Sequence, residues 1–133
     1  HLMELDNQLG SHTIFLGDIS KENLRDVYNS ARYFVLNSTY EGTSHALLEA
    51  RACGTFSIAR SGVGSNDEVV TNSLDGLLVD DQIITLKEAL EYALNNSSFV
   101  DSAQNLAVTK TKEYFDFEKN FSQIFDLVRK KPK

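Results

Sequence analysis

The sequence contains few of the residues that crosslinked or metal-stabilised folds require. Its 133 residues include one Cys, one Pro and no Trp. A single cysteine cannot form an internal disulfide or a zinc site made of several thiolates, so a disulfide framework and a zinc finger are excluded. Nothing in the composition requires an oxidising compartment.

Basic residues are outnumbered by acidic ones, 13 against 19, which gives a formal net charge of −6 and an isoelectric point near 5.0. A nucleic-acid binder usually carries a basic stripe, so polynucleotide partners are disfavoured. The basic cluster at the chain end, Arg129 to Lys133, has two interpretations that stay open. It is either a solvated helix end or a contact with an anionic membrane, which would make the protein a peripheral membrane protein.

Long hydrophobic runs are also missing. No segment approaches the roughly 20 apolar residues that a membrane span needs, and no charged start with an apolar core indicates a signal peptide. We therefore expect a cytoplasmic protein. The 41% hydrophobic and 24% charged residues are typical of a globular chain. The length fits one domain, residues 1–133, with residues 1–10 a leader or cloning remnant and residues 83–133 C-terminal helices.

Short β-branched or aromatic runs alternate with longer helical patterns, which is typical of βα units around a parallel sheet. The predicted strands are 13–16, 33–36, 55–59 and 77–79. The predicted helices are 20–29, 45–53, a short turn at 66–70, 83–94, 100–114 and 118–130. The predicted fold class is therefore α/β, a Rossmann-like parallel sheet with flanking helices. Because a complete doubly wound domain has about five or six strands, we expect a partial domain.

In open α/β sheets, ligands bind beyond the carboxyl ends of the strands, beside helix N-termini. The loop that follows the predicted strand 33–36 contains Glu41 and Gly42, and Glu49 comes about one turn into the next helix. Gly42 permits close approach of the backbone to a ligand, and free N–H groups at the helix start bind anionic or hydroxylated groups. A sugar nucleotide has an anionic diphosphate as well as hydroxyl groups. If Glu41 and Glu49 serve one such ligand, they should open on the same cleft.

His45 and Glu49 lie four residues apart on one helix face. Two interpretations of His45 stay open, a contact with the ligand and a local contact with Glu49.

Five segments between Thr13 and Val79 resemble the C-terminal, donor-binding domain of retaining glycosyltransferases with the GT-B fold, most of all family 4 (group 1). Their order and spacing are those of the family. The segments are Phe15-Leu16-Gly17, Ala31 to Ser38, Glu41-Gly42 with Leu47-Leu48-Glu49-Ala50, Gly62 to Val70, and Asp75-Gly76-Leu77-Leu78-Val79.

The resemblance implies transfer of a sugar from a nucleotide sugar to an acceptor hydroxyl with retention, and no cofactor. The implied catalytic residue is Glu41, beside the donor sugar, while Glu49 accepts hydrogen bonds from the ribose hydroxyls. No metal is implied, because the site has no clustered Asp or His ligands. The other implied donor-binding residues are Gly42, Thr43, Ser44 and His45 through their backbone amides, and Asp18 and Ile19 near the base. Gly62, Gly64 and Glu68 would shape the neighbouring loop.

The sequence departs from the family in two ways. Thr43-Ser44 stands where many relatives have Phe-Pro, which changes loop stiffness but keeps the backbone donors. The family's basic pair that grips the diphosphate would precede Leu2, as would the acceptor domain. We therefore expect an N-terminally truncated domain, inactive by itself and lacking its N-terminal acceptor domain. Arg60 and Lys21 are alternative cations for the phosphates, unless they are ordinary surface residues.

Two competing interpretations use the same fold. One is a non-catalytic nucleotide-sugar-binding or regulatory module that lost its chemistry. The other is a flavodoxin-like receiver domain, which is disfavoured because the acidic cluster expected after its first strand is absent from the sequence.

Overall fold

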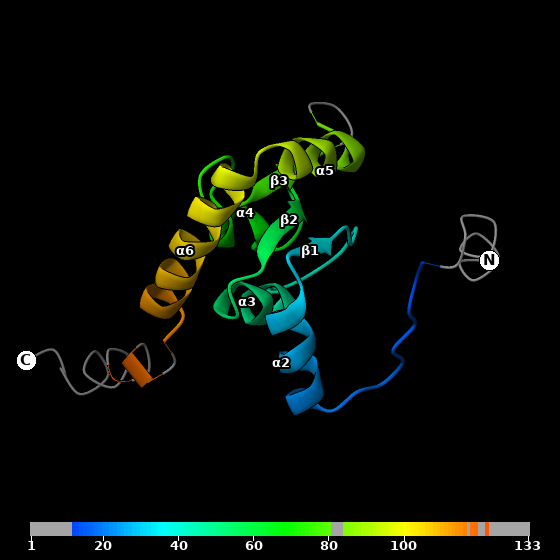
Figure 1. Ribbon diagram of the computed structural model, residues 1–133. Helices are drawn as coiled ribbons and strands as arrows, with labels where there is room; N and C mark the ends of the chain where they lie inside the picture. Colours follow the sequence, from blue (N-terminus) through cyan, green and yellow to red (C-terminus); the bar gives the residue numbers. More distant parts are fainter. Residues whose placement is uncertain (1–11, 81–83, 117, 120–121, 123–133) are drawn as a thin grey trace, which may run out of the picture.

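The computed structural model describes residues 12–80, 84–116, 118, 119 and 122, and its core is a three-stranded parallel sheet of order β1-β2-β3 (Figure 1). The strands are β1 (Tyr33–Leu36), β2 (Phe56–Arg60) and β3 (Leu77–Val79). Ile58 of the central strand is in register with Val35 on one side and Leu77 on the other. Parallel strands of this kind are buried on both faces, and residues 56–59 are buried accordingly.

Helices cover both faces of the sheet. They are α2 (Lys21–Ser30), α3 (His45–Ala52), α4 (Asn66–Val69), α5 (Leu86–Asn95) and α6 (Ser97–Tyr114). On one face, Phe56 and Ile58 pack with small residues of α5 and α6, among them Ala93 and Ala103. On the other face, Ala59 packs with Leu47 of α3 and with the end of α4. The predicted α/β class is confirmed, with side chains alternating between two helical layers.

The predicted strand at residues 13–16 is wrong. This segment is not part of the sheet, and Ile14, Phe15 and Leu16 are 82%, 50% and 51% exposed. In Figure 1 it runs away from the start of α2 instead of along β1. A short apolar segment becomes a strand only when a neighbouring strand and a covering layer bury it, and this segment has neither among the described residues.

The helix ends follow their capping residues. Ser20 and Ser44 cap α2 and α3 as predicted, their hydroxyls accepting from Asn23 N and Leu47 N. Gly54 follows the end of α3 with φ +79°, a left-handed conformation that glycine adopts at low cost. The boundaries of α5 and α6 differ from prediction by three residues at their starts. Predicted segments 1–10 and, almost entirely, 118–130 lie outside the described residues.

Candidate functional site

The candidate site begins at the carboxyl end of β1, where residues 37–44 lead into α3. Ser44 is buried, and its hydroxyl accepts from Leu47 N at 3.4 Å. Within the described part of the chain, the backbone N–H groups of Gly42, Thr43, Ser44 and His45 have no hydrogen-bond acceptor. They are donors at the positive end of a helix dipole, an arrangement that suits a phosphate or a hydroxyl group.

Glu41 and Gly42 pack against the glycine loop, residues 61–65, which follows β2. Ser65 N donates to the Gly42 carbonyl oxygen at 3.1 Å. Gly64 has φ +54°, and a Cβ atom at this position would overlap the Gly42 oxygen and lie 2.8 Å from the Glu41 oxygen. Only a glycine fits here, so Gly64 shapes the loop beside Glu41 as the sequence predicted.

Asp67 closes the glycine loop, a role that the sequence analysis missed. Its carboxylate accepts from the Ser61 hydroxyl at 2.6 Å and from Gly62 N at 2.7 Å. The buried Asn66 donates its amide to the Arg60 carbonyl at 2.9 Å. The available signal was an Asp in the first turn of a short helix that follows a glycine loop.

Glu49 lies in the second turn of α3 and lines a groove of about 260 Å³ between α2 and α3. The groove is lined by Lys21, Leu24, Arg25, Tyr28, Glu49, Ala52 and Cys53. Burial raises the pKa of the Tyr28 hydroxyl, and the neighbouring charges of Glu49 and Cys53 raise it further.

The structure places Glu41 in a loop and Glu49 in a helix, as predicted, but Glu41 does not line the groove of Glu49. The two glutamates therefore flank the start of α3 without sharing that cavity. His45 is exposed, and among the described residues no ion pair or hydrogen bond joins it to Glu49. Asp18 is exposed and Ile19 half-buried in the segment before α2.

Two cations that the sequence analysis considered occupy different places. Arg60, half-buried at the carboxyl end of β2, donates to the Asn37 amide oxygen at 3.4 Å, directly after β1. Lys21 is exposed at the start of α2 and lines the groove with Glu49. Arg60 is therefore the one of these two that belongs to the edge of the sheet where the loop of Glu41 begins.

Residues 2–113 match the sequence profile of the family described as Glycosyl transferases group 1. The chain belongs to this family. An uncharacterized glycosyltransferase of Methanocaldococcus jannaschii is 35% identical over 81 residues, 59% of this chain and 20% of that protein. A sucrose-phosphate synthase from Thermosynechococcus elongatus superposes on 96% of this chain and 33% of its own, with a TM-score of 0.83 and 28% identity.

Two further solved structures show the same fold. Anabaena HepE in complex with UDP has a TM-score of 0.79 and 17% identity, and the match covers 96% of this chain and 35% of HepE. The C-terminal domain of a group 1 glycosyl transferase from Francisella tularensis has a TM-score of 0.73 and 22% identity, over 86% of this chain and 60% of that domain. The group 1 chain thus spans a fifth of its curated relative and about a third of HepE and the synthase.

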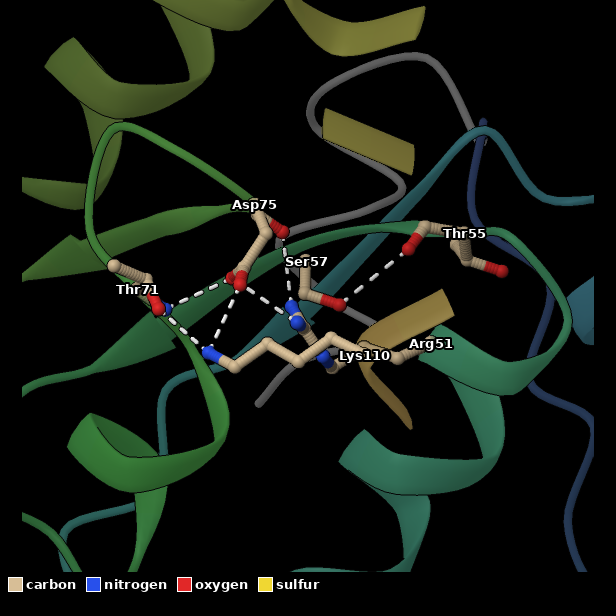
Figure 2. Close-up of polar contacts among 6 residues, drawn as sticks. All are labelled: Arg51, Thr55, Ser57, Thr71, Asp75 and Lys110. Atoms are coloured by element: carbon tan, nitrogen blue, oxygen red, sulfur yellow. Dashed lines mark hydrogen bonds and ion pairs between the residues drawn. The ribbon is translucent and has the colours of Figure 1, made fainter. Parts of the chain in front are cut away.

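A buried charge cluster lies at the opposite, amino-terminal edge of the sheet in this glycosyltransferase domain (Figure 2). Arg51, near the end of α3, is 1% exposed, and its Nη1 donates to the Asp75 carbonyl at 2.9 Å. Arg51 Nη2 lies 3.0 Å from Asp75 Oδ1, and Lys110 Nζ of α6 lies 3.0 Å from Asp75 Oδ2. Thr71 N also donates to Asp75 Oδ1 at 2.8 Å.

Asp75 remains ionised although it is buried. Burial raises the pKa of this carboxyl, but hydrogen bonds from Lys110 and Thr71 and the charge of Arg51 outweigh it, so the pKa lies below the ordinary value of 3.8. Burial lowers the pKa of Arg51, and Asp75 partly opposes this shift. Arg51 Nε has no hydrogen-bond partner within the described residues. The cluster joins α3, α6 and the turn before β3, so its role is structural.

The described part of the chain contains no group of three or more His, Cys, Asp and Glu side chains arranged to hold a metal ion. None of its helices combines the length and apolarity needed to cross a bilayer.

Proposed function

We propose that this chain is the donor-binding part of a retaining glycosyltransferase, which moves a sugar from a nucleotide sugar to an acceptor hydroxyl. The observation that carries the proposal is the start of α3. Its free N–H groups lie at the carboxyl edge of a parallel sheet, with Glu41 before them and Glu49 about one turn after. Doubly wound folds bind nucleotides at this edge.

Each group at the start of α3 has a chemical task in this proposal. The amides of residues 42–45 bind the diphosphate and stabilise the charge that develops on it as the sugar departs. The Glu49 carboxylate accepts hydrogen bonds from the ribose hydroxyls, which are charge-assisted and therefore strong. Glu41 lies beside the sugar, and Asp18 and Ile19 lie near the base. No metal or cofactor takes part.

The nucleotide is proposed from the structural neighbours. HepE structures contain UDP and UDP-glucose, and their 17–18% identity to this chain establishes the fold alone. UDP is therefore the first probe. The chain covers 33% of the synthase and 20% of the curated relative, so transfer belongs to the full-length protein. We propose that the 133-residue chain by itself binds the donor without transferring it.

The test is to incubate the full-length protein with UDP-glucose and a panel of hydroxyl acceptors and to follow the product by NMR. An anomeric configuration equal to that of the donor supports retention, and the inverted configuration contradicts it. Calorimetric titration with UDP measures donor binding separately. Binding without transfer to any acceptor would favour the alternative, a non-catalytic nucleotide-sugar-binding or regulatory module. No binding of UDP, GDP or ADP would contradict both.

A further inference from the structure

The orientation of the Thr43 N–H, in the loop 37–44, is set by a hydrogen bond from the glycine loop. Ser65 N donates to the Gly42 carbonyl oxygen at 3.1 Å. The peptide between Gly42 and Thr43 is planar and trans, so its N–H points opposite to its carbonyl. With the carbonyl turned toward Ser65, the Thr43 N–H faces away from the glycine loop, and Thr43 is exposed.

The Ser65 hydrogen bond exists only because the two loops approach closely. A Cβ atom on Gly64 would overlap the Gly42 oxygen, and the φ of +54° is one that other residues rarely adopt. A side chain at position 64 would therefore push residues 61–65 away from Gly42 and release the peptide.

Asp67 holds the glycine loop in this position. Its two carboxylate oxygens accept from the Ser61 hydroxyl and from Gly62 N, at 2.6 and 2.7 Å. Ser61 N in turn donates to the Val79 carbonyl at 2.9 Å, at the end of β3. The loop is thus attached to the sheet at Ser61 and held in its shape by Asp67. Its contact with Gly42 depends on both of these connections.

We infer that Asp67 and Gly64 are positioning residues of the donor site. Through the glycine loop they direct the Thr43 N–H toward the donor's phosphate or sugar hydroxyl groups. The inference rests on the proposed function, because it takes the amides of residues 42–45 as donor-binding groups. Asp67 acts through Ser61, Gly62 and Ser65 and does not touch the ligand.

The experiment compares Asp67→Asn with wild type in the full-length protein, by calorimetric titration with UDP and, separately, with uridine. Asn keeps the shape but replaces one acceptor oxygen with a donor. We expect the affinity for UDP to fall about threefold to tenfold, the loss of one hydrogen bond. The affinity for uridine should not change, because uridine lacks the phosphates that Thr43 serves. Ser61→Ala, which removes one of the two Asp67 bonds, should give a smaller effect on UDP.

The control is Glu91→Gln, which removes one negative charge from an exposed i,i+4 pair with Lys87 on α5. It should leave both affinities unchanged. Gly64→Ala is the stronger variant and should lower UDP affinity more than Asp67→Asn, with uridine binding as evidence that it folds.

If wild type binds UDP and Asp67→Asn binds it equally well, the positioning role is wrong while the proposed function stands. Equal losses of affinity for UDP and for uridine would indicate a general structural role and would also overturn the positioning role. If wild type does not bind UDP, both fail.

Discussion

At the scale of single residues, Glu41 and Glu49 are only eight positions apart in the sequence but occupy different environments. Glu41 is half-buried in a loop that packs on the glycine loop, whereas Glu49 is exposed on α3 and lines the groove beside α2. In the proposed function the two carboxylates address different parts of the donor, Glu41 the sugar and Glu49 the ribose.

Substitution of the two glutamates separates these roles. If Glu49 accepts from the ribose hydroxyls, Glu49→Ala should weaken nucleoside diphosphate binding by at most about 1.5 to 3 kcal/mol for each charge-assisted hydrogen bond lost. Glu49→Gln retains one acceptor oxygen and should cost less. Glu41→Ala should leave diphosphate affinity nearly intact while lowering turnover. Calorimetry and steady-state rates on the full-length variants measure both. Equal loss of diphosphate affinity at the two positions would show that the roles are misassigned.

A second residue-scale expectation concerns the buried pair of Arg51 and Asp75, whose side chains are 1% and 0% exposed. Asp75→Asn leaves Arg51 and Lys110 without their counter-charge, so the free energy of unfolding should fall by about 3 to 5 kcal/mol. Urea denaturation gives the value. The matched control is Asp101→Asn, which breaks an exposed pair with Arg32 and should cost less than about 1 kcal/mol. Similar losses for the two variants would contradict the expectation that an uncompensated buried charge costs more than an exposed one.

At the scale of elements, the predicted strands 33–36, 55–59 and 77–79 and the helix caps are confirmed, whereas the strand at 13–16 and the starts of α5 and α6 are not. Ser20 and Ser44 were identified as helix caps because a capping hydroxyl bonds a backbone N–H three residues away. The strand at 13–16 has a suitable local pattern, but a strand exists only through pairing, which no short window of sequence contains. The predicted start of α5 at residue 83 is early because Ile83 continues the apolar periodicity on the N-terminal side of the cap, Thr85.

The same distinction applies to the candidate site. The loop position of Glu41 and the helical position of Glu49 follow from Ser44 as N-cap, and the sequence predicted both. The contact between Gly64 and Gly42 and the pairing of Arg51 with Asp75 join segments more than 20 residues apart. Neither has a periodic or spacing signal. Arg51 shares the buried face of α3 with the apolar residues Leu47 and Ala50, which marks it as unusual but does not identify its partner.

The capping box of α5 gives an element-scale prediction. The Thr85 hydroxyl accepts from Glu88 N, and the Glu88 carboxylate accepts from Thr85 N at 2.9 Å. The Thr85 N–H and the Thr85 hydroxyl both donate to the Glu88 carboxylate, and these two bonds lower the pKa of Glu88. Thr85→Ala should destabilise the domain by about 1 kcal/mol, whereas Thr85→Ser should cost less because Ser retains the hydroxyl. Thermal unfolding compares the two variants, and equal stability of Ala and Ser would rule out the hydroxyl as the stabilising group.

At the scale of the whole molecule, the two edges of the sheet have different tasks. The proposed donor groups lie at the carboxyl ends of β1 and β2, and the Arg51, Asp75 and Lys110 cluster lies at the amino ends of β2 and β3. Stability from charge pairing therefore comes from residues that the proposed ligand does not contact.

Acid should destabilise the fold through Asp75. The pKa of Asp75 is lower in the folded protein than its ordinary value of 3.8. The unfolded state therefore binds the proton more readily, and the stabilisation is complete above about pH 4 and is lost as the pH falls through the folded pKa. Urea denaturation between about pH 6 and pH 2 should show this decrease, and Asp75→Asn should show a shallower one. A pH profile unchanged by Asp75→Asn would contradict the assignment.

The fit between Gly64 and the Gly42 carbonyl also constrains how such domains can be recombined. Residues 37–44 and 61–67 fit each other. The first segment contains the Gly42 carbonyl, and the second has a glycine at position 64, where a Cβ atom would overlap this carbonyl, and the Ser65 N–H that donates to it. A chimera that takes one loop from a relative and keeps the other would bring together parts that were never selected for each other. Grafts intended to change donor preference should therefore transfer both loops as one unit.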